Sequence, residues 1–332
     1  MTITVKENNG IRYGEFEIHG IKGTFPRQII TSTNLYQAED FEKPKFDFKT
    51  NIAEIIEFKP KKLVNDSDYR DYRKKKVSKM INENPDKLWL FTLKGARTSS
   101  FKMNKDDNES LIKFQIECGF KLIKTFFRTT KFALENSRYY RTIIPERCTF
   151  VASLDENLNH AIFRELYLEC CEKNKDEIIC FFGRIPSKKS SKNIHNKLNF
   201  EFVSQRLDEK VIRVTSFAPK SIDGAVSSII FNWFRFDLYS FITRRGNPDI
   251  PDYELKALNQ FLYEPLTKDT KLICPITQKN LYDSSQDFKN KYGKSSLPVS
   301  VHDIVRLNEI FTVLHEEFSR EQLEKILGKR IP

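Results

Sequence analysis

The chain is poor in cysteine and glycine, and it lacks several segments that would identify common classes of protein. Its 332 residues include six cysteines and 11 glycines. The cysteines do not have the spacing of a disulfide framework, which indicates a reducing, intracellular compartment. The N-terminus has no apolar run typical of a signal peptide, and no stretch approaches the about 18 to 20 apolar residues of a membrane span. These absences predict a cytoplasmic protein without membrane contact.

The glycine-rich motifs that cradle phosphates are missing too. No GxGxxG and no GxxxxGK[ST] follows any predicted strand. This absence excludes the commonest nucleotide-binding sheets as an explanation of the chain.

Positive charge is in excess. The sequence has 56 Lys and Arg against 45 Asp and Glu, a formal net charge of +11. A basic surface favours a polyanionic partner such as tRNA or DNA, because each neutralised phosphate releases counterions. The 28 Phe and 12 Tyr also leave aromatic side chains for stacking on bases. A generally basic, solvated surface is the alternative explanation.

Short apolar segments recur about every thirty residues, separated by amphipathic stretches such as Asn157 to Lys173 and Ser221 to Trp233. The predicted strands are Ile52 to Phe58, Leu88 to Leu93, Lys121 to Phe127, Thr149 to Leu154, Glu177 to Phe182, Val211 to Phe217 and Phe236 to Phe241. Strands joined by helical crossovers imply a parallel sheet, and this number of units favours a TIM-type (β/α)8 barrel. An open doubly wound sheet is the alternative fold.

Three regions are expected along the chain. Residues 1–50 read as a β-hairpin cap with turns at Asn8-Asn9-Gly10 and His19-Gly20. Residues 51–248 carry the α/β alternation of the barrel. Residues 249–332 lose that alternation and read as a small helical and irregular C-terminal extension.

Two basic stretches are candidate phosphate contacts. The first interleaves tyrosines with basic residues in a predicted helix, and the second lies in a predicted loop after a strand, where barrels place their active sites. A solvated helix face is the alternative for the first stretch. The candidate nucleic-acid-binding residues are Arg70, Arg73, Lys74, Lys75, Lys188 and Lys189, with Arg244 and Arg245 further along the chain.

Asp237 is a lone carboxylate in an aromatic, strand-like segment. An unpaired Asp is costly to bury as an ion, so it must lie at the open end of its strand, be hydrogen-bonded or take part in chemistry. Its placement in the last regular strand predicts a position on the catalytic face together with Asp155. The structural alternative is an ion pair with Arg244 or Arg245.

Several segments resemble, in the right order, the tRNA-guanine transglycosylase family, including relatives that insert deazapurines into DNA. Gly10 to Pro26 is similar to the family's opening hairpin. Phe150 to Glu156 is similar to its strand that ends in Ala-Phe-Asp-Glu, and Phe236-Asp237, followed by Thr243-Arg244, falls where the family has its Phe-Asp nucleophile. The resemblance implies a modified TIM barrel with a zinc-bearing C-terminal insertion.

The resemblance implies base exchange at an intact nucleic-acid backbone, in which a guanine is replaced by a 7-deazapurine. Asp237 would attack the anomeric carbon through an oxocarbenium-like transition state. Asp155 would be the second catalytic carboxylate and accept hydrogen bonds from the base edge. Phe217 and Tyr239 are expected to contact the base. The family commonly forms homodimers, so a second copy or a partner subunit is an expected partner.

The sequence departs from the family at three functional sites. The first is the family's Gly-Gly-Leu-Ala loop, which is reduced here to Ser216-Phe217-Ala218. Leu93 stands where the family has its general base, an Asp. In the zinc-binding frame only Cys274 and His302 are ligands, while Leu272 and Thr277 occupy the other two positions, so no complete zinc site and no confident cofactor is predicted. These departures leave two alternatives to the enzyme: a catalytically silent homologue that binds nucleic acid, and an unrelated barrel with ordinary strand-end carboxylates.

Overall fold

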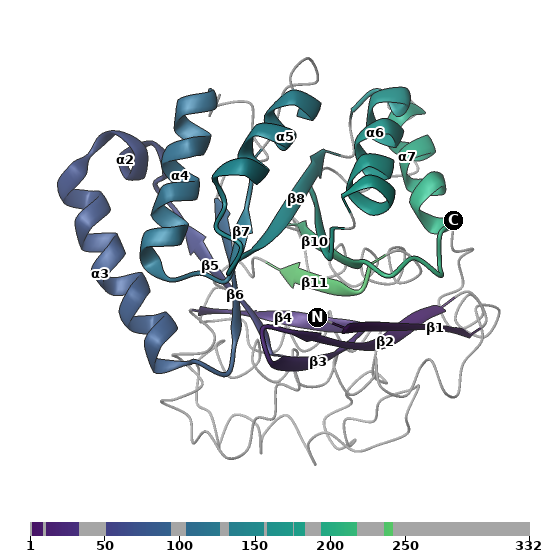
Figure 1. The fold of residues 1–332 in the computed structure, drawn as a ribbon, viewed down its shortest axis with the longest axis horizontal. Coiled ribbons are helices and arrows are strands. Elements are labelled where there is room, and N and C mark those ends of the chain that lie inside the picture. Colours follow the sequence, from purple (N-terminus) through teal and green to yellow (C-terminus); the bar gives the residue numbers. More distant parts are fainter. Residues whose placement is uncertain are drawn as a thin grey trace, which may run out of the picture.

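The protein is a mixed α/β structure, seen in a computed structural model that describes residues 2–8, 11–32, 51–93, 104–126, 133–155, 158–174, 176–182, 194–217 and 236–241. Its strands form a three-stranded antiparallel sheet and an eight-stranded sheet. No helix in the described ranges is long and apolar enough to cross a membrane. Figure 1 shows the helices along the outside of the larger sheet and the small sheet across one of its ends.

The small sheet consists of β1 (Thr2–Asn8), β2 (Ile11–Ile18) and β3 (Ile21–Phe25), in that order. Both pairings are antiparallel, as expected for successive hairpins. Gly14 is required in β2, because a Cβ atom there would lie 1.9 Å from the carbonyl oxygen of Thr4. This sheet confirms the predicted hairpin and adds a third strand to it.

The larger sheet is parallel throughout, in the order β6-β5-β4-β11-β10-β9-β8-β7. Its strands are β4 (Arg27–Thr31), β5 (Ile52–Glu57), β6 (Leu88–Leu93), β7 (Leu122–Lys124), β8 (Thr149–Asp155), β9 (Ile178–Phe182), β10 (Ile212–Phe217) and β11 (Leu238–Phe241). The first strand pairs with the last, so the strands succeed one another in chain order around the sheet. This succession is the one expected of an eight-stranded barrel.

The seven strands predicted from apolar segments each have a counterpart in this sheet. The eighth, β4, lies inside the region expected to be a separate cap, but it pairs with β11 and β5. The boundary expected at residue 50 therefore does not separate the cap from the parallel strands. The sequence signal was weak because β4 begins with two polar residues, Arg27 and Gln28.

Helices connect the strands on the outside of the larger sheet (Figure 1). They are α2 (Pro60–Asn65), α3 (Ser67–Glu83), α4 (Lys105–Cys118), α5 (Ala133–Ile143), α6 (His160–Leu168) with the π-helical turn η3 (Glu169–Lys173), and α7 (Ile194–Ser204). The second predicted helix, Ser221 to Trp233, and the C-terminal extension, 249–332, lie outside the described residues.

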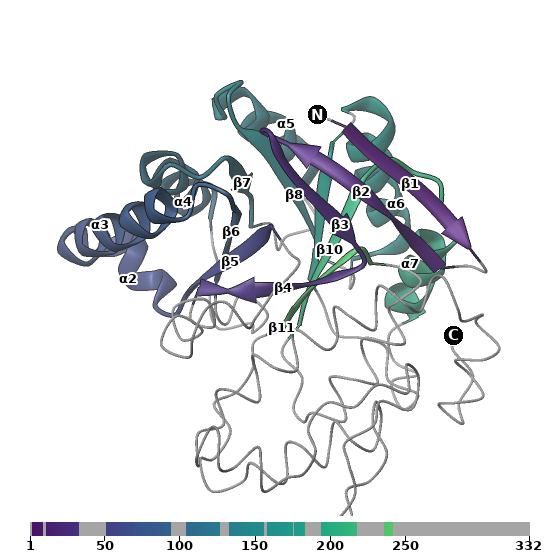
Figure 2. The same ribbon diagram turned by 90° about the horizontal axis from the view of Figure 1, so that it is seen from below.

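The small sheet packs on the end of the larger one at which the parallel strands begin (Figure 2). Apolar side chains of β1, β2 and β3, such as Ile3, Phe16 and Phe25, share one core cluster with the first inward residues of the parallel strands. Those inward residues include Ile52, Leu88, Leu122, Ile178, Ile212 and Leu238. We call the face of the larger sheet that carries them the inner face.

The ladder of the larger sheet is open between β6 and β7 in the described part of the chain, although the two strands contact each other. Gln115 of α4 occupies this position. Its Nε2 donates to the carbonyl oxygen of Lys124 at 2.9 Å, and its Oε1 accepts from the backbone N of Lys124 at 2.9 Å. The fully buried amide of Gln115 thus replaces the two ladder bonds that a neighbouring strand would make.

We expect Gln115→Ala to lower the free energy of unfolding by about 2 to 5 kcal/mol, because two buried backbone groups of Lys124 lose their partners. Urea unfolding measures this change. Gln205→Ala is the matched control, since Gln205 is exposed, and it should change stability little. An equal loss in both variants would contradict the role assigned to Gln115.

Candidate functional site

Asp237 and Asp155 lie at opposite ends of the parallel sheet. Asp237 immediately precedes the first residue of β11, whereas Asp155 is the last residue of β8. The expectation that both carboxylates share the catalytic face is therefore wrong. The apolar segment in the sequence located β11, but it did not show at which end of β11 the carboxylate of Asp237 lies.

Both carboxylate oxygens of Asp237 are engaged. Oδ1 accepts from Nε of Arg12 at 2.8 Å, and Oδ2 accepts from the backbone N of Arg213 at 2.8 Å. The side chains of Asp237 and Arg12 are both fully buried. The alternative partners named above, Arg244 and Arg245, lie outside the described residues. An ion with this environment is a structural group, since neither oxygen is free to attack a substrate.

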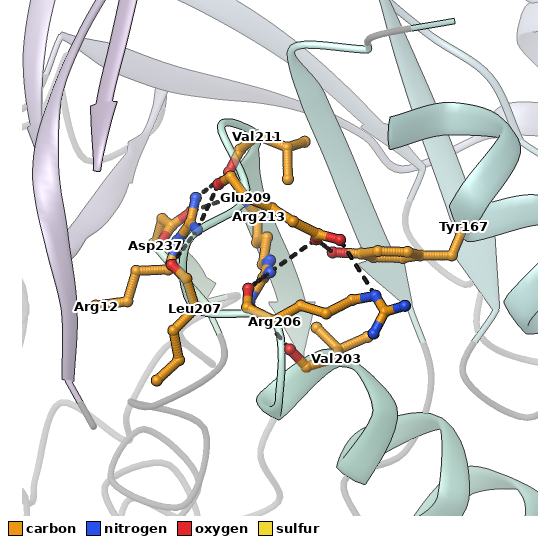
Figure 3. A network of polar contacts seen from close by, with 9 residues as sticks. All are labelled: Arg12, Tyr167, Val203, Arg206, Leu207, Glu209, Val211, Arg213 and Asp237. Carbon is orange, nitrogen blue, oxygen red and sulfur yellow. Dashed lines mark hydrogen bonds and ion pairs between the residues drawn. The ribbon is translucent and has the colours of Figure 1, made fainter. Parts of the chain in front are cut away.

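Arg12 reaches this position from β2 and binds the loop before β10 as well. Its Nη1 donates to the carbonyl oxygens of Leu207 at 2.8 Å and Glu209 at 2.5 Å, and its Nη2 donates to that of Val211. Figure 3 shows the guanidinium between Asp237 and these carbonyl groups. We call Arg12 with Asp237 the anchor, because it joins the small sheet to the start of β11.

A second buried arginine continues the network (Figure 3). Nη2 of Arg213 donates to Oε2 of Glu209 at 3.0 Å, and the hydroxyl of Tyr167 donates to the same oxygen. Burial, together with this nearby carboxylate, raises the pKa of Tyr167. Tyr167 therefore stays neutral and acts as a donor, and the whole network is structural.

A different polar group lies on the inner face further along the strands. Glu54 of β5, Thr92 of β6 and Lys124 of β7 are each less than a tenth exposed. The Thr92 hydroxyl donates to Oε1 of Glu54 and accepts from Nζ of Lys124 at 3.2 Å. An ammonium, a hydroxyl and a carboxylate thus form one hydrogen-bonded chain, which is a geometry that can pass a proton.

Ser153 and Cys180 extend this group on the neighbouring strands. They are register partners in β8 and β9, and Cys180 belongs to the inner-face cluster. Burial raises the pKa of the Cys180 thiol to about 11, with Lys124 lowering it and Glu54 raising it. The charges of Lys124 and Glu54 therefore both act on the Cys180 thiol. We call Glu54, Thr92, Lys124, Ser153 and Cys180 the inner polar cluster.

Asp155 lies on the same strand as Ser153, two residues closer to the strand's end. The ladder joins four strands through one row of paired residues: Leu154, Phe181, Thr215 and Tyr239. Asp155 follows Leu154, so its level on β11 is that of Ser240, not of Asp237. Three residues along a strand span about 10 Å. Of the expected base contacts, Phe217 ends β10 and Tyr239 lies within β11.

The first basic stretch is used mostly inside the protein. Arg73 donates to the buried Glu57 at 2.7 Å, Arg70 donates to the Ser110 hydroxyl at 2.6 Å, and Lys74 pairs with Glu117 at 3.1 Å. These three hold α3 against β5 and α4, while Lys75 is exposed and the side chain of Lys74 is 41% exposed, so the expectation that they contact phosphates stays a prediction. Lys188, Lys189, Arg244 and Arg245 lie outside the described residues.

The structure offers no complete metal site where it can be described. Those ranges hold no group of three or more His, Cys, Asp or Glu side chains able to bind a metal ion. Cys274 and His302 lie outside them. Among the described cysteines, burial also raises the pKa of Cys118 and Cys171 to about 12, so both thiols are neutral at pH 7. The Leu93 position is apolar as expected, and its side chain is buried.

The residues that the sequence analysis missed are Arg12, Glu54 and Lys124. Glu54 and Lys124 resemble Asp237 in being charged residues inside apolar predicted strands, although each of their strands holds a second charge, Glu57 and Lys121. Arg12 carries no local signal, since its partner lies 225 residues away. A search for charged residues in the predicted strands would have found Glu54 and Lys124.

We expect Arg12→Met or Asp237→Leu alone to lower the free energy of unfolding by about 3 to 5 kcal/mol, because each leaves an uncompensated buried charge. The double variant should lose less than the sum of the two single losses. Urea unfolding of all three gives the coupling. The exposed pair Lys79 and Glu83 is the control, and Lys79→Met should have little effect. Additive losses in the double variant would contradict the anchor.

We expect Cys180 to resist iodoacetamide at pH 8 in the folded protein and to react in urea. A thiol with a pKa of about 9 in the unfolded chain and about 11 in the fold is neutral at pH 8 and stabilises the fold below pH 9. That contribution is lost as the pH rises through 9 to 11. Mass spectrometry of the alkylated peptides measures the effect, with the less buried Cys148 as the faster internal reference. Equal rates for Cys180 with and without urea would contradict its burial.

Comparison with known proteins adds no identification. No protein-family model matches the chain, and no curated protein matches it. The function must therefore be argued from the arrangement of its residues.

Proposed function

We propose that the eight parallel strands form a (β/α)8 barrel that binds a purine base of a nucleic acid at the strand ends around Asp155, without base exchange through Asp237. The observation that carries this proposal is the separation of the two carboxylates. Asp155 ends β8, whereas Asp237 is buried in the anchor at the opposite end. Barrel proteins place their ligands at the ends where the parallel strands finish.

The chemistry of that end suits a base. A carboxylate such as Asp155 accepts hydrogen bonds from the N–H groups of a base edge. The inner polar cluster lies below Asp155 on the same face, so further polar groups face the same space. The formal net charge of +11 supports attraction of a phosphate backbone. We propose a purine as the ligand because the segment from Phe150 to Glu156 resembles the base-binding strand of the transglycosylases.

Base exchange through Asp237 is disfavoured on physical grounds. A covalent glycosyl intermediate needs a carboxylate oxygen free to reach the anomeric carbon. Asp237 has both oxygens bonded within the anchor. The residue level with Asp155 on β11 is Ser240, which is not a carboxylate. Binding alone requires no nucleophile, so the binding role that we propose does not depend on Asp237.

The hydrogen-bonded chain of Lys124, Thr92 and Glu54 favours a second candidate, in which the chain is an enzyme that performs base exchange through Asp155. An oxygen of Asp155 would form a bond to the anomeric carbon while the bond from that carbon to the purine nitrogen breaks. The departing purine would keep the electron pair and take a proton supplied through Lys124. The incoming base would then attack the same carbon, return the proton of its N–H group to Lys124 and release Asp155.

We expect the protein to bind tRNA or duplex DNA in a salt-dependent manner and to incorporate no labelled guanine into either. Asp155→Asn should weaken binding of hypoxanthine about ten- to hundredfold, because the amide replaces one of the two acceptor oxygens of the carboxylate by an NH2 donor. Calorimetry measures this change. Asp208→Asn, at an exposed position, is the matched control and should bind like the wild type.

The competing outcomes are distinct. Incorporation of labelled guanine that Asp155→Asn abolishes would replace the binding proposal by the enzyme. Incorporation that only Asp237→Asn abolishes, with an intact fold by circular dichroism, would contradict both. Failure of the wild type to bind any purine would sink the proposal altogether.

A further inference from the structure

Lys124 is a buried lysine whose ammonium group has few partners. The group carries three N–H donors, and among the described residues it donates to one oxygen, the Thr92 hydroxyl at 3.2 Å. Its other close contact is the ring of Phe126, whose centroid lies 5.9 Å from Nζ. The residue is 6% exposed. An ammonium ion in this environment is costly, because its unused donors have lost their water.

Ser153, on the adjacent strand, carries a second polar group with unused capacity. Its Oγ is buried and has no hydrogen-bond partner in the part of the chain that the structure describes. Lys124 pairs in register with Val151, so Ser153 lies on the same inner face, two residues further along β8. Native proteins leave few buried polar groups unsatisfied. The two side chains together therefore indicate a site at which a small molecule supplies the missing bonds.

Thr92 and Glu54 provide a path for a proton of the ammonium group. The Thr92 hydroxyl accepts from Nζ of Lys124 and donates to Oε1 of Glu54. A proton can therefore pass from Lys124 to Thr92 while Thr92 passes its own proton to Glu54. Burial disfavours both charged forms, so this transfer costs less inside the sheet than in water. It leaves a neutral amine, and desolvation is one of the ways in which proteins turn a lysine into a nucleophile.

The position of Lys124 suits a reacting group. It is the last residue of β7, and the small sheet packs on the first inward residues of the parallel strands, at the opposite end. Barrel enzymes place their catalytic residues where the parallel strands finish. The side chains of Lys124 and Thr92 are each 6% exposed, so they can meet only a small solute.

A carbonyl compound is the class of substrate that fits these groups. Its carbon accepts the electron pair of Nζ, and its oxygen accepts a hydrogen bond from the Ser153 hydroxyl. The charge of Lys124 is already balanced by Glu54, to which Thr92 links it. A substrate with its own negative charge would add a buried ion without a counter-charge. The arrangement thus favours a small, neutral aldehyde.

We infer that Lys124 forms an imine with such an aldehyde. Lys124 first gives a proton through Thr92 to Glu54. Nζ then bonds to the carbonyl carbon, and the carbonyl oxygen takes a proton from the nitrogen. The proton held by Glu54 returns through Thr92 to the new hydroxyl group, which leaves as water while the electron pair of the nitrogen forms the C=N bond.

The four side chains have different parts in this step. Lys124 and Ser153 touch the aldehyde, whereas Thr92 and Glu54 are positioning residues that act through Lys124. The inference goes beyond the proposed purine binding and does not rest on it, and its test uses no purine.

The test traps the imine in the full-length chain. The folded protein is incubated with glycolaldehyde and sodium cyanoborohydride, which reduces an iminium ion to a stable amine, and peptide mass spectrometry follows the modification of each lysine. We expect Lys124 to be modified at least about tenfold faster than Lys75, which is exposed on α3, because positioned acid–base groups accelerate such steps about a hundredfold or more. In guanidinium chloride the two rates should be equal. With glyoxylate, an anionic aldehyde of similar size, the ratio of the two rates should be about tenfold lower.

Variants assign the step to named side chains. Ser153→Ala removes a hydroxyl without a partner, so the fold should keep its stability, while the rate at Lys124 should fall about tenfold or more. Thr92→Val should lower this rate as well, and Thr92→Ser, which keeps the hydroxyl, should retain it. Ser67→Ala is the matched control for Ser153→Ala, since Ser67 is exposed, and it should leave the rate unchanged.

Three results would overturn the inference. The first is modification of Lys124 no faster than that of Lys75 in the folded wild type. The second is an equal ratio of rates for glycolaldehyde and glyoxylate. The third is a wild-type rate at Lys124 in the Thr92→Val variant, folded by circular dichroism.

Discussion

The ion pair between Arg12 and Asp237 determines which end of the larger sheet is available to a ligand. A buried guanidinium and a buried carboxylate are tolerable only when both have nearly all their hydrogen bonds. Arg12 meets this demand with Asp237 and three carbonyl groups of the loop before β10. These bonds fix the small sheet over the beginnings of the parallel strands. The small sheet covers that end, so the ligand site that we propose lies at the other ends of the strands, around Asp155.

The inner face changes character along the strands as a consequence. Near the small sheet it is apolar, with residues such as Ile52, Leu88 and Leu122 in the core cluster. One or two inward positions further on, it carries Glu54, Thr92 and Lys124. Apolar burial stabilises the covered end. The polar groups lie where the strands finish, and the hydrogen bonds between them offset part of the cost of their burial.

The sequence predicted the elements much better than their ends and partners. Apolar segments located seven of the parallel strands, because buried parallel strands are continuous hydrophobic runs. Asp237 belonged to such a run, but the run does not show whether the carboxylate lies at the beginning or at the end of its strand. Only the pairing with the neighbouring strands shows that Ser240, three residues after Asp237, is the residue level with Asp155. The contact of Arg12 with Asp237 joins residues 225 apart, which no local pattern encodes. Two charges of the basic helix also have partners on other elements that no local pattern encodes, since Arg73 pairs with Glu57 and Lys74 pairs with Glu117.

Lys124, at the open ladder between β6 and β7, is bonded by residues of two neighbouring elements. Its backbone is bonded by Gln115 of α4, and its side chain is bonded by Thr92 of β6. A ladder closed by backbone bonds alone would fix the strand but not the ammonium group. With the amide of Gln115 in place of those bonds, β7 is bonded to α4, and the charge of Lys124 lies on the inner face. The open ladder between β6 and β7 therefore also helps to orient the ammonium group of Lys124. The position of Nζ depends on the packing of α4 as well as on the strands.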